Sequence, residues 1–265
     1  MTDITKTNKI SKELNKIYRH LLKNDQIILQ MQDDLQRLRD VSDKQFKELY
    51  FANLLHDTII NSSWLKDKSF SLYGWAANYS FIYMLYRILD NVKHHHILEM
   101  GMGQTSRVTS QYVAYGNPDA TLDIIENDAG WISTYHPLLA QSKNIKIHNC
   151  DLEFFKDGEC ECRKYKDLSN VVEDTKYDLV IVDGPWGAEQ TLPRSNILDI
   201  IKSGNLADDF IIIFDDAERR GEQNTINNTL KLLEEKHTEY FTFKRNGIKT
   251  QQIITSITRD FTQYL

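Results

Sequence analysis

Apolar residues near the start of the chain follow a seven-residue repeat. Two interleaved rows carry it: Ile10, Ile17, Met31 and Leu38 on one, and Leu14, Leu21, Ile28 and Leu35 on the other. Such a heptad pattern is typical of an α-helix that buries one stripe against a second helix. The repeat is interrupted at Asn24 and fades at Ser42, and no Pro or Gly precedes Gly74. We predict a helical region over residues 1–45 that forms a homo-oligomer through residues 10–41, although an amphipathic helix packed on its own subunit would show the same pattern.

Aromatic residues are concentrated in the next region, residues 46–95. Several recur with apolar neighbours at helical spacing: Trp75, Tyr79, Ile82, Tyr83, Tyr86 and Leu89. This spacing predicts a helix whose rings lie mostly in the core and which leads into a strand. Rings near the start of that helix form a candidate stacking wall for an acceptor ligand, namely Trp64, Phe70, Tyr73 and Trp75.

Strand and helix patterns alternate from His96 onward. The predicted strands are His96–Met100, Thr121–Glu126 and the runs in NIKIHNCD, YDLVIVDGP and DFIIIFDD. The predicted helices are Thr105–Tyr115, Gly130–Gln141 and the runs in SNILDIIKSG and NTINNTLKLLEEKH. Apolar runs such as LVIV and FIIIF are expected of parallel strands buried on both faces. Two β-rich runs around Asn246-Gly247 predict a hairpin. The fold class is therefore α/β, a doubly wound, mostly parallel seven-stranded sheet over residues 96–265 that ends in an antiparallel hairpin.

Composition narrows the class of protein. A chain of 265 residues with 41% hydrophobic residues is long and apolar enough to bury a large core. Its net charge is −6, so it does not resemble a nucleic-acid binder. It shows neither a secretory signal nor a run of 18 apolar residues, so we expect no membrane span and a cytoplasmic location.

The cysteines also favour a reducing, cytoplasmic location. Cys150, Cys160 and Cys162 are an odd, clustered set, which does not suggest a disulfide framework. Together with His148 they offer four zinc ligands, but the spacing H-x-C and C-x-C is unusual for a zinc site. We therefore interpret residues 156–176 as a short charged insertion with reduced thiols.

A glycine turn joins the first predicted strand of the sheet to a helix in HILEMGMGQTS. A strand, a glycine turn and a helix start together are typical of a nucleotide-type cofactor site. A dinucleotide site requires a third glycine, and here that position is Ser106. Glu99, Gly101 and Gly103 form instead an acid followed by G-x-G.

These features resemble the class I methyltransferases, the Rossmann-like family that uses S-adenosylmethionine. The resemblance covers residues from about 75 to the end of the chain. S-adenosylmethionine carries an ammonium and a sulfonium but no phosphate, so a carboxylate on the turn suits it and would repel a pyrophosphate. The resemblance implies that Glu126 accepts the ribose hydroxyls and that Asp151 lies near the adenine. The cofactor-binding residues that it implies are Glu99, Gly101, Gly103, Gln104, Glu126 and Asp151.

Three carboxylates follow the next two strands. Asp183 ends LVIVD, and Asp215 and Asp216 end IIIFDD, so all three should meet at the carboxyl edge of the sheet. Unpaired carboxylates repel one another, and a hard cation such as Mg²⁺ relieves the repulsion. The layout resembles the metal-dependent O-methyltransferases that act on sugars, which implies that these three residues hold Mg²⁺ and that the metal binds the acceptor hydroxyl.

The general base is less clear from this resemblance. Related sugar enzymes often carry a second acid two residues after the fourth-strand Asp, and here that position is Pro185. Glu218 and Glu222 in DDAERRGE are substitute candidates beside the fourth-strand Asp itself, with Arg219 and Arg220 available to an anionic acceptor. A solvated, charged helix start is the alternative interpretation.

The sequence thus predicts an S-adenosylmethionine-dependent O-methyltransferase that acts on a small-molecule or glycan hydroxyl. The segments DGP and DDAERRGE resemble those of methyltransferases that modify polysaccharide sugars, which favours a sugar or a surface-glycan precursor as acceptor. One alternative is an inactive methyltransferase fold used as a coiled-coil adaptor, which the intact acids disfavour. Another is an NAD-type oxidoreductase, which Ser106, Glu99 and the terminal hairpin disfavour.

Overall fold

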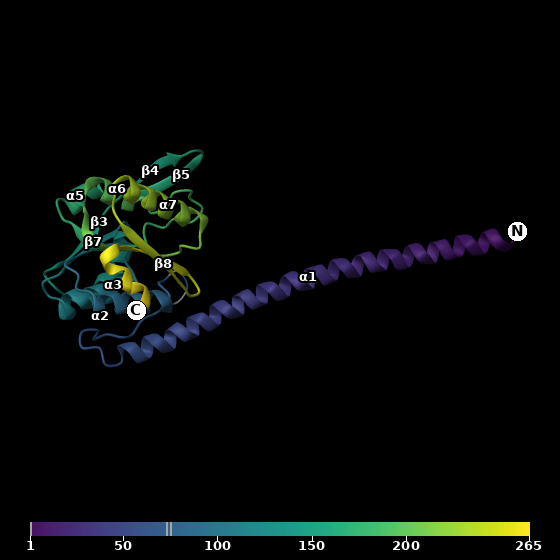
Figure 1. Ribbon diagram of the computed structural model, residues 1–265, viewed down its shortest axis with the longest axis horizontal. Coiled ribbons are helices and arrows are strands. Elements are labelled where there is room, and N and C mark those ends of the chain that lie inside the picture. The colour runs from purple at the N-terminus through teal and green to yellow at the C-terminus, as the bar shows by residue number, and fades with distance from the viewer. Residues whose placement is uncertain (1, 73, 75) are drawn as a thin grey trace. The chain divides into compact units, whose positions relative to one another are not determined.

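The computed structural model describes residues 2–72, 74 and 76–265, with side chains described from residue 11 onward. The chain divides into two compact units, Met1–Phe46 and Lys47–Leu265. The second unit contains the whole sheet, and Figure 1 shows its helices above and below that sheet.

Helix α1 spans Thr2–Ile59 and is longer than the predicted helical region. The fading of the heptad at Ser42 removes an apolar stripe but introduces no Pro or Gly, so the helix continues. Within the first unit, the apolar side chains of the heptad rows are exposed, for example Leu21 at 55% and Leu38 at 65%. The side chain of Ile10 lies outside the described part. Within the second unit, Leu55 is buried in the core.

The main sheet has seven strands in the order β3-β2-β1-β6-β7-β9-β8. The strands are β1 (His96–Met100), β2 (Thr121–Glu126), β3 (Ile145–Asn149), β6 (Tyr177–Val182), β7 (Leu206–Phe214), β8 (Tyr240–Asn246) and β9 (Thr250–Ser256). The first five pair in parallel, whereas β9 runs antiparallel to both β7 and β8. This arrangement confirms the predicted fold class.

Helices cover both faces of the sheet because neighbouring strand residues point to opposite sides. Ile97 and Leu179 belong to one core with the helices α2 (Tyr79–Asn91) and α3 (Gln104–Gln111). Leu98 and Val180 belong to a second core with the helices α6 (Asn196–Ser203) and α7 (Arg220–Glu235). The remaining helical segments are α4 (Ala129–Tyr135), α5 (Leu168–Val172), η1 (Tyr112–Gly116), η2 (His136–Leu138) and η3 (Ile257–Tyr264).

Aromatic residues before the sheet are mostly structural, as predicted. Trp64 is 5% exposed, stacks on Tyr86 at a centroid distance of 5.0 Å, and donates its Nε1 hydrogen to Asp90. The prediction that Trp64 belongs to an acceptor wall is therefore wrong. Phe70 is partly buried against the same core, and the other two predicted wall residues, Tyr73 and Trp75, lie outside the described residues.

A separate two-stranded sheet follows β3. Its strands β4 (Leu152–Asp157) and β5 (Cys160–Tyr165) pair antiparallel, and β5 lies within residues 156–176, which were predicted to be a charged insertion. The hairpin forms because Gly158-Glu159 makes a two-residue turn, with Gly158 at a φ of +62°. The zinc alternative receives no support. His148 contacts Asp123 at 2.7 Å, and among the described residues the side chains that converge as a possible metal site are three aspartates.

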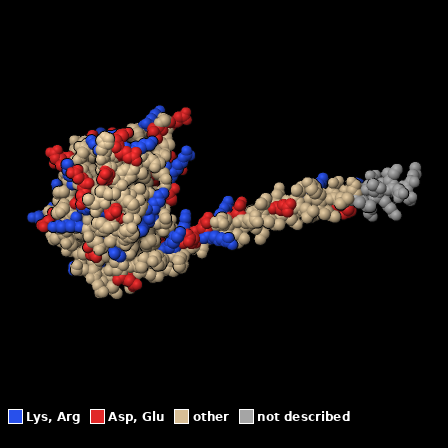
Figure 2. Space-filling view, viewed as in Figure 1, with Lys and Arg blue, Asp and Glu red and all other residues tan. Residues whose placement is uncertain are grey.

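Helix apolarity and surface charge are two further properties of the described residues. No helix in the described part of the chain has the length and apolarity needed to cross a membrane. On the face of the sheet unit shown in Figure 2, basic and acidic side chains are interspersed.

Candidate active site

A pocket of about 740 Å³ lies at the carboxyl edge of the parallel strands. Its walls come from the segments that follow β1, β2, β6 and β7, together with Lys249 from the terminal hairpin. Open α/β sheets bind their ligands at this edge because the connecting loops diverge there. The pocket therefore lies where the sequence predicted the ligands to meet.

The glycine turn after β1 shapes one side of the pocket. Gly101 has a φ of +97°, and a Cβ atom there would lie 2.8 Å from the backbone nitrogen of Gly184. Only glycine fits this contact, which brings the turns after β1 and β6 together. A Cβ atom on Gly103 would meet nothing within 4 Å, so this part of the turn leaves room for a ligand. Gln104 also lines the pocket and accepts a hydrogen bond from the Ser71 nitrogen at 3.3 Å.

Glu126 lines the same half of the pocket at the end of β2. Its Oε2 atom accepts a hydrogen bond from the Met102 nitrogen at 3.1 Å. Its Oε1 atom accepts from the nitrogens of Asn127 and Asp128 at 2.7 and 3.0 Å. A carboxylate has about four acceptor positions, so these bonds orient Glu126 and leave acceptor capacity for a ligand hydroxyl.

An aromatic wall closes this half of the pocket, and the sequence analysis missed it. Trp131 and Tyr135 line the pocket with Leu138, and their rings stack at a centroid distance of 4.8 Å. The Trp131 indole donates to the Met102 carbonyl at 2.8 Å, which ties the wall to the glycine turn. A tryptophan five residues beyond Glu126, on the helix that starts there, was the available signal. Such a wall suits a planar base.

Two predicted cofactor residues lie outside the pocket lining. Glu99 is fully buried beneath α3, where it accepts hydrogen bonds from the hydroxyls of Ser106 and Thr109 at 2.8 Å, and burial raises its pKa to about 7. The hydroxyl-rich start of α3 therefore holds this carboxylate away from the ligand. Asp151 is exposed and leads directly into β4, with its carbonyl accepting from the Lys166 nitrogen. Direct contact of either residue with a ligand in this pocket is not supported.

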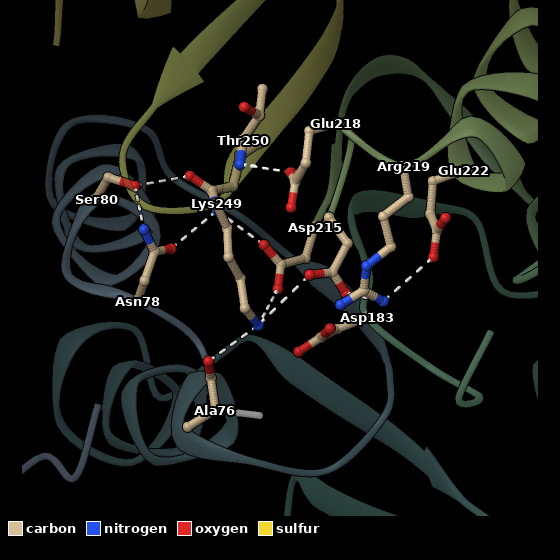
Figure 3. Close-up of polar contacts among 12 residues, drawn as sticks. Ala76, Asn78, Ser80, Asp183, Asp215, Glu218, Arg219, Glu222, Lys249 and Thr250 are labelled. Carbon is tan, nitrogen blue, oxygen red and sulfur yellow. Dashed lines mark hydrogen bonds and ion pairs between the residues drawn. The ribbon is translucent and has the colours of Figure 1, made fainter. Parts of the chain in front are cut away.

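The three predicted metal ligands converge, but they are not unpaired. Asp183, Asp215 and Asp216 each offer an oxygen within 4.8 Å of the others. Asp215 is fully buried, and its two oxygens accept hydrogen bonds from Gln251 at 2.7 Å and Lys249 at 3.3 Å. Figure 3 shows the Lys249 ammonium between Asp215 and the carbonyl of Ala76. The repulsion expected among these acids is thus partly relieved by protein groups.

Arg194 is the central cation of this cluster. It is 3% exposed, and its Nη2 atom donates to Asp216 Oδ2 at 2.7 Å and lies 3.4 Å from Asp183 Oδ1. Arg219 contacts the same oxygen of Asp216 at 3.0 Å. Asp216 has a φ of +56°, a left-handed conformation that Asp tolerates better than most residues. The sequence analysis missed Arg194 and Lys249, because no spacing or motif marks them.

The acids of the cluster differ in their affinity for a proton. Burial and the neighbouring Asp215 carboxylate raise the pKa of Asp183 well above its ordinary value. Burial also opposes ionisation of Asp216, but the combined attraction of Arg194, Lys249 and Arg219 lowers its pKa. The Asp183 side chain is 21% exposed. Asp183 is therefore the member suited to exchange a proton with a ligand, while Asp216 stays ionised.

A resident Mg²⁺ does not fit this arrangement, although the oxygen ligands are of the right kind. Lys249 and Gln251 take both oxygens of Asp215, and two arginines share Asp216 Oδ2. Three cationic side chains, Arg194, Arg219 and Lys249, already balance the charge of the three carboxylates. The predicted metal ligands therefore form an ion-pair network in this structure.

Glu218 and Glu222, the substitute bases, do not line the pocket. Glu218 is exposed and accepts from the Thr250 nitrogen at 2.8 Å (Figure 3). Glu222 is 2% exposed and lies 3.6 Å from Arg219, beside a neighbouring cavity of about 550 Å³. Its pKa is raised by burial. The helix start α7 thus places both carboxylates away from the acceptor side of the main pocket, which leaves Asp183 as its candidate base.

Some solved structures of other proteins are similar to this chain at low sequence identity. The sequence matches no family model, and no curated protein is significantly similar to it. Precorrin-6Y C5,15-methyltransferase from Geobacter metallireducens has a TM-score of 0.46 and 11% identity, covering 71% of this chain and 94% of that chain. SAH-bound methyltransferase PaMTH1 of Podospora anserina has a TM-score of 0.43 and 14% identity, covering 68% and 79%. Human methyltransferase-like protein 13 in complex with SAH has 0.43 and 15%, covering 68% and 80%.

Proposed function

We propose that this protein is an S-adenosylmethionine-dependent methyltransferase that acts on a hydroxyl group of a sugar or glycan. One observation carries the proposal. A single pocket joins a glycine turn and Glu126, which suit a nucleoside, to Asp183, a carboxyl with a raised pKa beside Arg194. Methyl transfer to a hydroxyl needs a site for the nucleoside of the methyl donor and a group that takes the proton of the acceptor hydroxyl. This pocket offers both.

The cofactor half of the pocket fits the chemical groups of S-adenosylmethionine. Glu126 has acceptor capacity for a ribose hydroxyl, and the Trp131 and Tyr135 rings offer a wall for the adenine. Gly103 provides the space for the chain of the ligand to pass close to the backbone. When bound, this cofactor supplies an electrophilic methyl group.

The acceptor half would handle the proton. Asp183 Oδ is proposed to take the proton of the acceptor hydroxyl, and its raised pKa makes it a stronger base than an ordinary aspartate. Arg194 and Lys249 hold the other two carboxylates in place, so that these carboxylates do not move toward the reacting oxygen. Positioning of this kind contributes much of the rate in transfer reactions.

The character of the acceptor half favours a polyhydroxylated acceptor. Asp183, Asp216, Arg194, Arg219 and Lys249 all line it, so it is rich in hydrogen-bonding groups. A sugar presents several hydroxyls to such groups, whereas an apolar acceptor would leave them unsatisfied. The proposed reaction uses no metal, because Lys249 already pairs with two of the three carboxylates that the sequence resemblance assigned to it.

Calorimetry with S-adenosylmethionine and with NAD tests the proposal directly. We expect S-adenosylmethionine to bind and NAD not to bind. Glu126→Ala should weaken the binding free energy of S-adenosylmethionine by about 1–3 kcal/mol, the usual cost of deleting a charged hydrogen-bond partner. Asp151→Ala is the matched control, because Asp151 is an exposed strand-end acid outside the pocket lining. If the wild-type chain bound no S-adenosylmethionine, or bound NAD in its place, the proposed function would be wrong.

A further inference from the structure

Trp186 is an aromatic residue that the proposed reaction leaves without a role. It lines the main pocket three residues after Asp183 and is 53% exposed. Tryptophan is usually well buried because exposing the large apolar surface of its ring to water is unfavourable in free energy. A half-exposed indole that lines this pocket is therefore a surface that a ligand would cover.

The β4–β5 hairpin holds this indole in place. The Arg163 guanidinium lies over the Trp186 ring, 5.1 Å from its centroid. The Arg163 backbone nitrogen donates to Gln190 Oε1 at 2.7 Å, and Gln190 Nε2 donates to the Trp186 carbonyl at 3.0 Å. Gln190 is 7% exposed, so this bridge is shielded from water. The ring and its backbone are thus both tied to β5.

The segment before Trp186 has little room to move. A Cβ atom on Gly184 would lie 2.4 Å from the Tyr165 hydroxyl and 2.7 Å from the Gly101 Cα. Tyr165 is itself fixed, because the Asn196 side chain bonds both its backbone nitrogen and its carbonyl, at 2.8 and 2.9 Å. The loop therefore presents Trp186 at a defined position beside Asp183, which saves the entropic cost of ordering it on binding.

We propose that Trp186 is the stacking platform for the sugar ring of the acceptor, positioned by Arg163 from the hairpin. A pyranose ring has an apolar face of C–H groups and a rim of hydroxyls. The indole would cover the face, while Asp183, Asp216 and Arg219 bond the rim. A planar phenol would also stack, but it would leave most of these charged groups without partners, at a cost in binding free energy. This inference rests on the proposed function, since it assigns the acceptor of the same site.

Saturation-transfer-difference NMR tests whether Trp186 binds a sugar ring. The sample is the full chain with a saturating concentration of S-adenosylhomocysteine. The probes are the methyl pyranosides of glucose, galactose, mannose, rhamnose and glucuronic acid, with catechol as the phenol. We expect transfer to the ring C–H protons of at least one pyranoside, with about tenfold weaker affinity in Trp186→Ala and partial recovery in Trp186→Phe. Arg163→Ala should weaken the same pyranoside by a smaller factor.

Tyr115→Ala is the matched control, since Tyr115 is 50% exposed and lies outside the pocket lining. Unchanged S-adenosylhomocysteine affinity in each variant shows that the fold and the cofactor half are intact. The proposed role of Trp186 would be overturned if none of the pyranosides bound, or if a pyranoside bound wild type and Trp186→Ala with equal affinity. It would also be overturned if catechol were the only probe whose binding depended on Trp186. Failure to bind S-adenosylhomocysteine would count against the proposed function instead, so the two outcomes are separable.

Discussion

Arg194 donates a hydrogen bond to Asp216 at 2.7 Å, and each of the two side chains is 4% exposed. The pair is buried at the carboxyl edge of the sheet, so removing Arg194 leaves only two cations, Lys249 and Arg219, against three carboxylates there. We expect Arg194→Ala to lower the free energy of unfolding by about 3–5 kcal/mol. Urea denaturation measures this change. Arg220→Ala, at an exposed position, should shift it by about 0.5 kcal/mol or less. Equal midpoints for the two variants would show that the pair adds nothing to stability.

Lys249 decides whether the carboxylates need a metal. Because its ammonium contacts both Asp215 and Asp216, we expect methyl transfer to continue in excess EDTA and calorimetry to show no tight Mg²⁺ binding. Lys249→Met removes the ammonium and should create measurable Mg²⁺ affinity. Lys244→Met, at an exposed position of the same hairpin, should not. Turnover that disappears in EDTA and returns with Mg²⁺ would restore the metal mechanism predicted from the sequence.

Asp183 should set the acidic side of the pH–rate profile. Only its ionised form accepts a proton, and its pKa is raised by burial and by Asp215, so activity should rise with pH beyond the ordinary range of an aspartate. Asp183→Asn should lower kcat by about 100-fold or more, and its residual activity should lack this rise, while cofactor affinity is retained. Asp151→Asn serves as the control. A profile that is unchanged in Asp183→Asn would assign the base elsewhere.

Glu99 should make stability depend on pH. Burial raises its folded pKa from 4.5 to about 7, so the folded chain holds the proton more tightly than the unfolded chain. This contribution is complete below pH 4.5 and is lost as the pH rises toward about 7, a loss of about 3 kcal/mol. Urea denaturation of wild type and Glu99→Gln between pH 4 and about 8 isolates the effect. The stability difference should shift in favour of Glu99→Gln as the pH rises, and a constant difference would contradict the assignment.

The heptad rows of α1 remain a proposal for self-association. Leu21 and Ile28 are 55% and 52% exposed within the first unit, so a second copy is the partner we propose for them. Substituting both with Glu should reduce the mass measured by light scattering to that of one chain. Leu29→Glu is the control, because Leu29 is 62% exposed but lies outside both rows. If light scattering showed the wild-type chain to be monomeric, self-association through the heptad rows would be ruled out.

Local patterns predicted the framework of this protein well. The strands β1 and β2 have the predicted bounds, and the Asn246-Gly247 hairpin reverses the end of the sheet as expected. Apolar runs and turn residues act over a few neighbouring positions, so they can be recognised without knowing the fold. The helix α1 was predicted too short because a lost apolar stripe was taken for a helix end.

The convergence of the acids was also accessible from the sequence. Asp183 follows β6, Asp215 and Asp216 follow β7, and the carboxyl ends of parallel strands meet at one edge. What the sequence could not show was the charge around them. Nothing in the chain marks Arg194 or Lys249 as partners of acids more than 20 residues away.

The sequence alone thus determined the succession of strands and helices of the main sheet, the glycine turn and the edge of the sheet where ligands meet, because these depend on short-range patterns. Tertiary structure alone decided that Glu99 lies beneath α3, that cationic side chains occupy the carboxylate cluster, and that a hairpin holds Trp186 at the pocket. Ion pairing and burial depend on distances in space, and those distances follow from the packing of segments far apart in the chain.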